Sequence, residues 1–94
     1  MTRFVYYQDP GHGWVEVSLA ILIDLGIASQ VSHYSYVDDT HTYINDPLVY
    51  LEEDCDAGLF IEAFQKKHGS QPDLYSMYQE NIFIRKLPRY RVQA

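Results

Sequence analysis

The segment that decides the fold class is DCDAGLFIEAFQKKHG, which occupies residues 54–69. Its apolar side chains recur at helical spacing and form one face: Leu59, Phe60, Ala63 and Phe64. Acidic residues stand at its start and basic residues at its end, which complements the helix dipole. Asp54 or Asp56 can cap the first turn, and Gly69 can take the left-handed conformation that ends a helix. The spacing therefore predicts a helix.

Short segments with β-type composition surround this helix: residues 4–7, 14–17, 31–37, 48–51, 74–78 and 82–85. Residues 42–44 favour a return strand after a turn at residues 38–40, and Pro47 makes that hairpin irregular. A second, short helix is predicted between Ser18, which has the right type for an N-cap, and Gly26.

The resulting order, β-β-α-β-β-α-β-β, predicts an α+β fold with a small antiparallel sheet and two helices packed on one face. We expect one domain, residues 1–94, in which residues 87–94 form an extended basic tail. A single cysteine, Cys55, excludes an intrachain disulfide and fits a reducing interior. No basic and apolar leader opens the chain, and residues 19–23, its longest apolar run, are too few to span a bilayer. A soluble cytoplasmic protein with no membrane partner is expected.

Charge is divided unevenly along the chain. Residues 4–65 contain eleven acids and no lysine or arginine, whereas residues 66–94 contain six basic residues and two acids. With Arg3, the formal net charge is −6. The long acidic section should repel phosphate backbones and attract basic protein surfaces over about 8–10 Å at ordinary salt. The sequence therefore favours binding to a basic protein surface over catalysis.

The residues expected to bind a partner are acids and tyrosines from the middle of the chain. Tyrosine is abundant, with nine in 94 residues. A tyrosine surplus beside a strong charge field is typical of protein-binding surfaces, although most of these rings should lie in the core. The predicted partner-binding residues are Asp38, Asp39, Asp46, Glu52, Glu53, Asp54 and Asp56, with Tyr34, Tyr36 and Tyr50 as aromatic anchors.

The acidic run at residues 52–56 also raises the question of a metal site, which His12, His33 or His41 could join. The run lacks the alternating oxygens, central glycine and terminal glutamate of a calcium-binding EF-hand loop. Capping of the following helix explains the acids more simply. The prediction is therefore no metal and no cofactor.

Cys55 lies at the predicted helix start, where the helix dipole favours a thiolate. The run DCDAGL at residues 54–59 is similar to the nucleophile motif of NlpC-class cysteine peptidases. The neighbouring acids should raise the thiol pKa, and His68, the histidine that follows, would lie about 20 Å away along the same helix. We expect a buried, inert cysteine and no catalytic residues. A small enzyme using Cys55 or a His/carboxylate site remains the alternative.

Two further features of the sequence give weaker evidence for a binding site. Residues 11–13, Gly-His-Gly, give a permissive backbone around an imidazole, but they do not form a phosphate-binding loop. The basic residues at 85–91 are interleaved with Phe83 and Tyr90, an arrangement that can contact nucleic acid. They are equally able to neutralise the acidic section within the fold. We therefore expect no direct binding to nucleic acid.

Several short motifs are spread over most of the chain: PGHGW at 10–14, LGI at 25–27, YSY at 34–36, YLEEDCDA at 50–57 and IR at 84–85. Together they resemble a group of uncharacterised proteins encoded by phages and other mobile elements. The resemblance implies a small protein that disables host defence, as anti-CRISPR proteins do by occupying basic surfaces of CRISPR effectors. The other alternative is a homo-oligomeric accessory module, in which exposed strand edges pair between copies.

Overall fold

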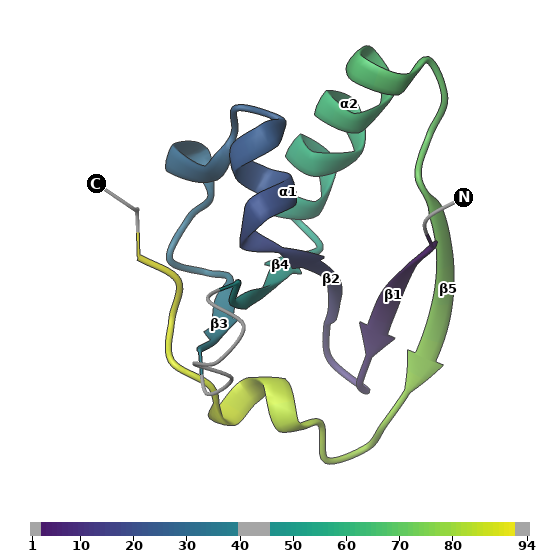
Figure 1. The fold of residues 1–94 in the computed structure, drawn as a ribbon. Coiled ribbons are helices and arrows are strands. Elements are labelled where there is room, and N and C mark those ends of the chain that lie inside the picture. Colours follow the sequence, from purple (N-terminus) through teal and green to yellow (C-terminus); the bar gives the residue numbers. More distant parts are fainter. Residues whose placement is uncertain (1–2, 40–45, 92–94) are drawn as a thin grey trace.

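The computed structural model describes residues 3–39 and 46–91. Its elements are β1 (Arg3–Gln8), β2 (Gly13–Ser18), α1 (Leu19–Asp24), η1 (Ala28–Gln30), β3 (Tyr36–Asp38), β4 (Leu48–Glu52), α2 (Asp56–His68), β5 (Asp73–Tyr78) and η2 (Phe83–Lys86), where η marks a 3-10 helix. The α+β class is confirmed (Figure 1). The expected return strand at 42–44, Thr40 of the predicted turn and His41 lie outside the described residues.

The five strands form one sheet in the order β3-β4-β2-β1-β5. Three neighbouring pairs are antiparallel, but β5 runs parallel to β1, from Arg3 opposite Asp73 to Gln8 opposite Tyr78. The prediction of an antiparallel sheet is therefore wrong at this pair, and the sheet is mixed. The reason is that α2 carries the chain back to the beginning of β1, so β5 starts beside that end.

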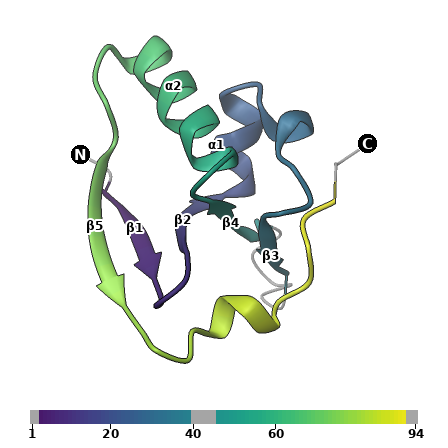
Figure 2. The same cartoon turned by 180° about the vertical axis from the view of Figure 1, so that it is seen from behind.

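Both α-helices pack on one face of the sheet, as predicted (Figures 1 and 2). Side chains alternate along the strands, and the inward set meets Leu22 of α1 and Phe60 of α2 in one core. The strand residues in this core are Phe4, Val15, Val17, Val49 and Leu51. Phe4 also stacks edge-on against Phe60, with ring centroids 5.1 Å apart.

The opposite face of the sheet carries a second core that η2 covers. Its buried residues are Trp14, Tyr36, Tyr50, Ile82 and Ile84. The prediction of a strand at residues 82–85 is wrong, because the chain forms a 3-10 turn at Phe83–Lys86. This turn buries Ile84 in the second core and leaves Arg85 partly exposed.

The predicted strand at residues 31–37 is mostly not a strand. β3 contains only Tyr36–Asp38, and a turn precedes it in which the Ser35 N–H bonds to the Ser32 carbonyl. Hydroxyl groups on both serines donate to the carboxylate of Asp56 on α2. The turn is therefore fixed by a side chain that is distant in sequence, and local alternation could not reveal it.

The helix ends agree with the sequence except at the start of α2. Ser18 caps α1 by accepting a bond from the Ile21 N–H, and Gly26 and Gly69 follow their helices at φ 75° and 79°. The N-cap of α2 is Cys55, without a side-chain cap bond, so the predicted capping by Asp54 or Asp56 is wrong. The Asp56 carboxylate instead accepts hydrogen bonds from Ser32 and Ser35.

The segment after η2 packs along β3 instead of extending as a loose tail. Tyr90 is buried, and its hydroxyl donates to the Ala28 carbonyl at 2.6 Å. Backbone bonds join Val37 to Pro88 and Tyr90 to Ser35, which covers the outer edge of β3. The basic tail expected at 87–94 is thus partly structural, and its last three residues lie outside the described range.

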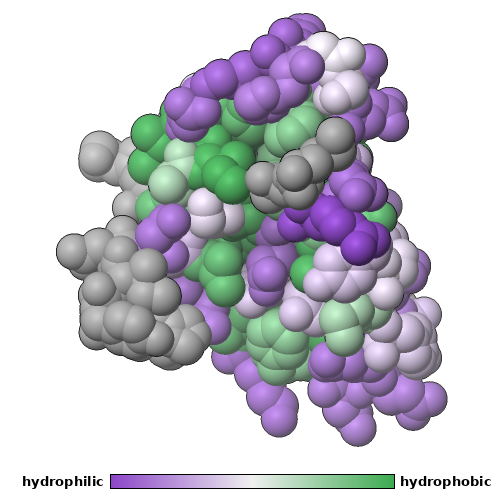
Figure 3. Space-filling view, turned by 45° about the vertical axis from the view of Figure 1, so that its right-hand side comes forward, coloured by the Kyte–Doolittle hydropathy of each residue, from purple (hydrophilic) through white to green (hydrophobic). Residues whose placement is uncertain are grey.

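The surface mixes hydrophobic and hydrophilic side chains. Figure 3 shows hydrophobic atoms reaching the surface in the middle of one face, with hydrophilic regions above and below. No helix in the described segments has the length and apolar character needed to cross a membrane.

Candidate functional site

A pocket of about 480 Å³ lies where β4 ends and α2 begins. We call it the His12 pocket. Four chain segments meet there: the β1–β2 loop, the turn before β3, the β4–α2 junction and the C-terminal segment. The lining residues are His12, Trp14, Tyr34, Tyr36, Glu52, Asp54, Cys55, Arg85 and Arg89.

The β1–β2 loop is fixed by Asp9, which is buried. Its Oδ1 accepts bonds from the backbone N–H groups of Gly11 and His12 at 2.9 and 2.8 Å. Arg85 donates to the same carboxylate through Nε and Nη2. This guanidinium, together with the two backbone donors, holds the pKa of Asp9 well below its usual range. Loop and η2 are therefore joined by one ion pair.

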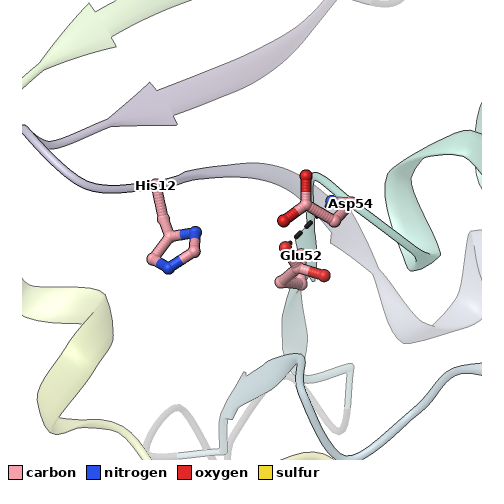
Figure 4. Close-up of side chains that lie close together, drawn as sticks. All are labelled: His12, Glu52 and Asp54. Carbon is pink, nitrogen blue, oxygen red and sulfur yellow. Dashed lines mark hydrogen bonds between the residues drawn. The ribbon is translucent and has the colours of Figure 1, made fainter.

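Strand pairing brings His12 to the acidic run. Trp14 of β2 lies opposite Glu52 of β4, and the Glu53 N–H extends the pairing by bonding to the Gly13 carbonyl. One donor atom from each of His12, Glu52 and Asp54 lies within 4.8 Å of the other two (Figure 4). The Asp54 N–H donates to Glu52 Oε2 at 2.9 Å, and the Nδ1 atom of His12 is 3.6 Å from Glu53 Oε1.

Aromatic rings and arginines form the opposite wall. The rings of Trp14 and Tyr36 meet edge-on at 6.2 Å, with Arg85 over the first and Arg89 over the second. Arg89 also donates to the Tyr34 carbonyl at 3.3 Å. Both guanidinium groups are thus held by contacts within the protein, and the pocket combines carboxylates, an imidazole and fixed cations.

Four of the ten residues predicted to bind a partner line the His12 pocket: Tyr34, Tyr36, Glu52 and Asp54. Glu53 is adjacent, and its Oε2 accepts a bond from the Tyr6 hydroxyl at 2.7 Å. Burial and this carboxylate raise the pKa of Tyr6 to about 12. Tyr34 and Asp54 are exposed, whereas Tyr36 and Glu52 are largely buried. A partner can therefore contact Tyr34 and Asp54 directly.

Two predicted partner residues belong to the interior instead. Asp56 is 3% exposed and accepts bonds from the backbone and hydroxyl of Ser32 and from the hydroxyl of Ser35. Tyr50 is 2% exposed, and its hydroxyl donates to Glu16. Burial, and then the Glu16 carboxylate, raise the pKa of Tyr50. Neither side chain is available to a partner on this surface, so their placement in the partner set is corrected.

The remaining predicted acids lie at the other end of the β3–β4 pair. Asp38 is opposite Leu48 at the start of β4. Leu48 and Glu52, at the two ends of β4, are about 13 Å apart along the strand. Asp39 is exposed beside it, and Asp46 accepts a bond from the Ala20 N–H at the start of α1. The predicted acids therefore form two groups and not one continuous cluster.

Cys55 is exposed and not buried as predicted. Loss of hydration, followed by the charges of Glu52, Asp56 and Asp54, raises the pKa of its thiol. The thiol form is therefore favoured at neutral pH, which argues against a ready nucleophile.

Ion pairs distribute the charge unevenly. Arg3 pairs with Asp73, Lys66 with Glu62, Lys67 with Asp24 and Arg85 with Asp9. None of these four acids belongs to the predicted partner set. Of that set, Asp39 and Asp54 are exposed and contribute to the formal net charge of −6.

Sequence reasoning missed the contribution of Trp14, Arg85 and Arg89 to this pocket, and it named His12 only as one of three histidines that could join the acidic run. The acidic run and the Gly-His-Gly segment were both noticeable, but only the register of β2 on β4 places them together. Comparison with family models, with curated proteins and with solved structures found no match.

Proposed function

We propose that the protein is a non-enzymatic inhibitor that binds a basic, nucleic-acid-binding surface of a host defence protein, with a CRISPR effector as the leading candidate. The observation that carries the proposal is the exposure of two acids, Asp39 after β3 and Asp54 after β4, which place negative charge on the surface at the two ends of the β3–β4 pair.

Two exposed acids, Asp39 and Asp54, present this charge to a partner. Channels lined with lysine and arginine bind carboxylates for the same reason that they bind phosphates. Tyr34, 54% exposed at the rim of the His12 pocket, offers an aromatic face to a partner's guanidinium. The resemblance to small proteins of phages and mobile elements supplies the expected setting, which is inhibition of host defence.

The proposal is tested with tagged protein as bait in a lysate of CRISPR-bearing bacteria, at about 0.1 M and 0.5 M salt. The informative variant is Asp39→Lys with Asp54→Lys. Glu52 and Glu53 are less suitable for charge reversal because both accept hydrogen bonds within the protein. The matched control is Glu62→Lys with Glu80→Lys, which changes the net charge equally at two other exposed positions.

We expect wild type and the control variant to retain a CRISPR effector subunit at low salt and to release it at high salt. The Asp39→Lys, Asp54→Lys variant should not retain it. Equal retention by both double variants would mean that net charge, and not this surface, determines binding.

One observation favours the homo-oligomeric alternative. Within the described residues β5 pairs only with β1, and it exposes Tyr75, Met77 and Tyr78. An exposed strand edge can pair with a second copy. Light scattering distinguishes the two functions, because a stable dimer whose formation is blocked by Ser76→Pro would favour the oligomeric role. The Gln79 N–H bonds to Gln8 of β1, so by alternation the Ser76 N–H faces the free edge and its loss spares the β1–β5 pairing.

A further inference from the structure

Three metal-ligating side chains converge in the His12 pocket. One donor atom from each of His12, Glu52 and Asp54 lies within 4.8 Å of the others (Figure 4). Donor atoms around a tetrahedral ion lie about 3.4 Å apart. His12 and Asp54 are both exposed, so small side-chain rotations can bring the three donors to this spacing without moving the strands.

The donor set indicates the class of ion. An imidazole with two carboxylates suits Zn²⁺, Co²⁺ or Mn²⁺, whereas Ca²⁺ and Mg²⁺ take oxygen ligands. The Glu53 carboxylate lies 3.6 Å from Nδ1 of His12. This third carboxylate adds negative charge beside the imidazole.

A second, independent observation comes from Trp14, which lines the same pocket. The side chain is 2% exposed, and its Nε1–H is the one buried side-chain polar atom in the described residues without a hydrogen-bond partner. Buried donors nearly always have a partner, and an unsatisfied one is often explained by a bound water or ion. The indole ring that carries this donor lies beside His12, with ring centroids 6.2 Å apart.

The local charge also favours a cation. Glu52, Glu53 and Asp54 are consecutive, so their carboxylates repel one another at neutral pH. Arg85 and Arg89 also line this pocket, but each already has a partner: Arg85 donates to Asp9 and Arg89 to the Tyr34 carbonyl. A divalent ion between the carboxylates would offset their repulsion.

We propose that His12, Glu52 and Asp54 bind one divalent transition-metal cation of the Zn²⁺ class, leaving at least one coordination position open. The site stands on its own geometry and does not rest on the proposed function. It differs from the expectation of no metal, which named His12 as one of three histidines that could join the acidic run but had no strand register to place it there.

Trp14 provides a direct reporter, because it is the only tryptophan and its ring centroid is 6.2 Å from that of His12. The protein is first treated with a chelator. Co²⁺, which quenches nearby indole fluorescence, is then titrated in, and Zn²⁺ is added as a competitor. Calorimetry of Zn²⁺ binding gives the stoichiometry independently.

We expect saturable quenching that Zn²⁺ reverses, with one ion bound per chain. His12→Ala and Asp54→Asn should weaken binding by about tenfold or more. The matched controls His68→Ala and Asp39→Asn, at exposed positions outside the pocket, should bind as wild type does. Circular dichroism confirms that each variant is folded.

Absence of saturable binding to the wild type at millimolar Co²⁺ and Zn²⁺ would overturn the proposal. So would binding that His12→Ala and Asp54→Asn leave unchanged. Neither result bears on partner capture by the acidic surface, so the two proposals fail separately.

Discussion

Gly13 lies against the ring of Tyr6, where an added Cβ would come within 2.4 Å of the hydroxyl oxygen. The ring cannot move away freely, because its hydroxyl is bonded to Glu53. Gly13→Ala should therefore lower the free energy of unfolding by about 1–3 kcal/mol in urea denaturation. The matched control is Gly58→Ala in α2, where an added Cβ meets no atom within 4 Å. It should stabilise the protein by up to about 1 kcal/mol; equal effects from both variants would contradict the packing argument.

Asp56 links α2 to the turn before β3. Asp56→Ala leaves the buried hydroxyl of Ser35 and the groups of Ser32 without their acceptor, so we expect a loss of about 3 kcal/mol. Asp54→Ala, two residues away and exposed, should change stability by less than about 0.5 kcal/mol. Urea denaturation in chelator compares the two. If Asp56→Ala lowers the free energy of unfolding less than Asp54→Ala does, Asp56 does not hold the turn before β3 against α2.

Asp9 makes stability depend on pH. Its pKa in the folded protein is lowered by Arg85, so the unfolded chain takes up a proton at higher pH than the folded protein does. The stabilisation is therefore complete above about pH 4 and is lost as the pH falls further. Asp9→Asn should be less stable than wild type at pH 7, and its unfolding midpoint should decline less between about pH 5 and pH 2. If the unfolding midpoints of wild type and Asp9→Asn decline in parallel with pH, the Asp9–Arg85 pair does not contribute to stability.

At the scale of elements, the sequence correctly predicted the helices, caps and strands that are determined by the spacing of nearby residues. The apolar face of α2, the Ser18 cap and the glycines after both helices are confirmed, as are strands close to the expected positions in β1, β2, β4 and β5. The failures occurred where a distant group decides the backbone. Asp56 fixes a turn in place of a strand at Ser32, and burial of Ile84 favours a 3-10 turn over a strand.

The candidate site was predictable only in part, for the same reason. The acidic run was visible in the sequence, and Glu52 and Asp54 do line the pocket. Their neighbour His12 is about forty residues away in sequence, and no local pattern encodes the register that joins them. Burial of Tyr50 was equally hidden, because alternation does not say which face of a sheet will be covered. Asp56 is buried because Ser32 and Ser35, distant in sequence, bond to it.

The C-terminal segment is an integral element of this fold. Tyr90 is 1% exposed and closes the edge of β3. Tyr90→Ala should lower the free energy of unfolding by about 3–5 kcal/mol, whereas Tyr90→Phe, which removes only the bond to Ala28, should cost about 1 kcal/mol. Thermal and urea unfolding measure both. If Tyr90→Ala is no worse than Tyr75→Ala on exposed β5, the segment is not part of the core.

At the scale of the whole molecule, folding partly reverses the charge division of the sequence. The basic C-terminal third returns to the acidic section, where Arg85 and Lys67 pair with Asp9 and Asp24. The exposed acids Asp39 and Asp54 lie outside these pairs, at the two ends of the β3–β4 pair. A basic partner surface and a divalent cation would therefore be drawn to overlapping carboxylates at Asp54.

The most direct measurement is inhibition of CRISPR interference in living cells. A strain whose CRISPR system targets a plasmid would express wild type, the Asp39→Lys, Asp54→Lys variant or the Glu62→Lys, Glu80→Lys variant at equal levels. Plasmid transformation is then counted. Wild type and the Glu62→Lys, Glu80→Lys variant should both raise transformation, and the Asp39→Lys, Asp54→Lys variant should not. No rise with folded wild type, or an equal rise with all three proteins, would contradict inhibition through this acidic surface.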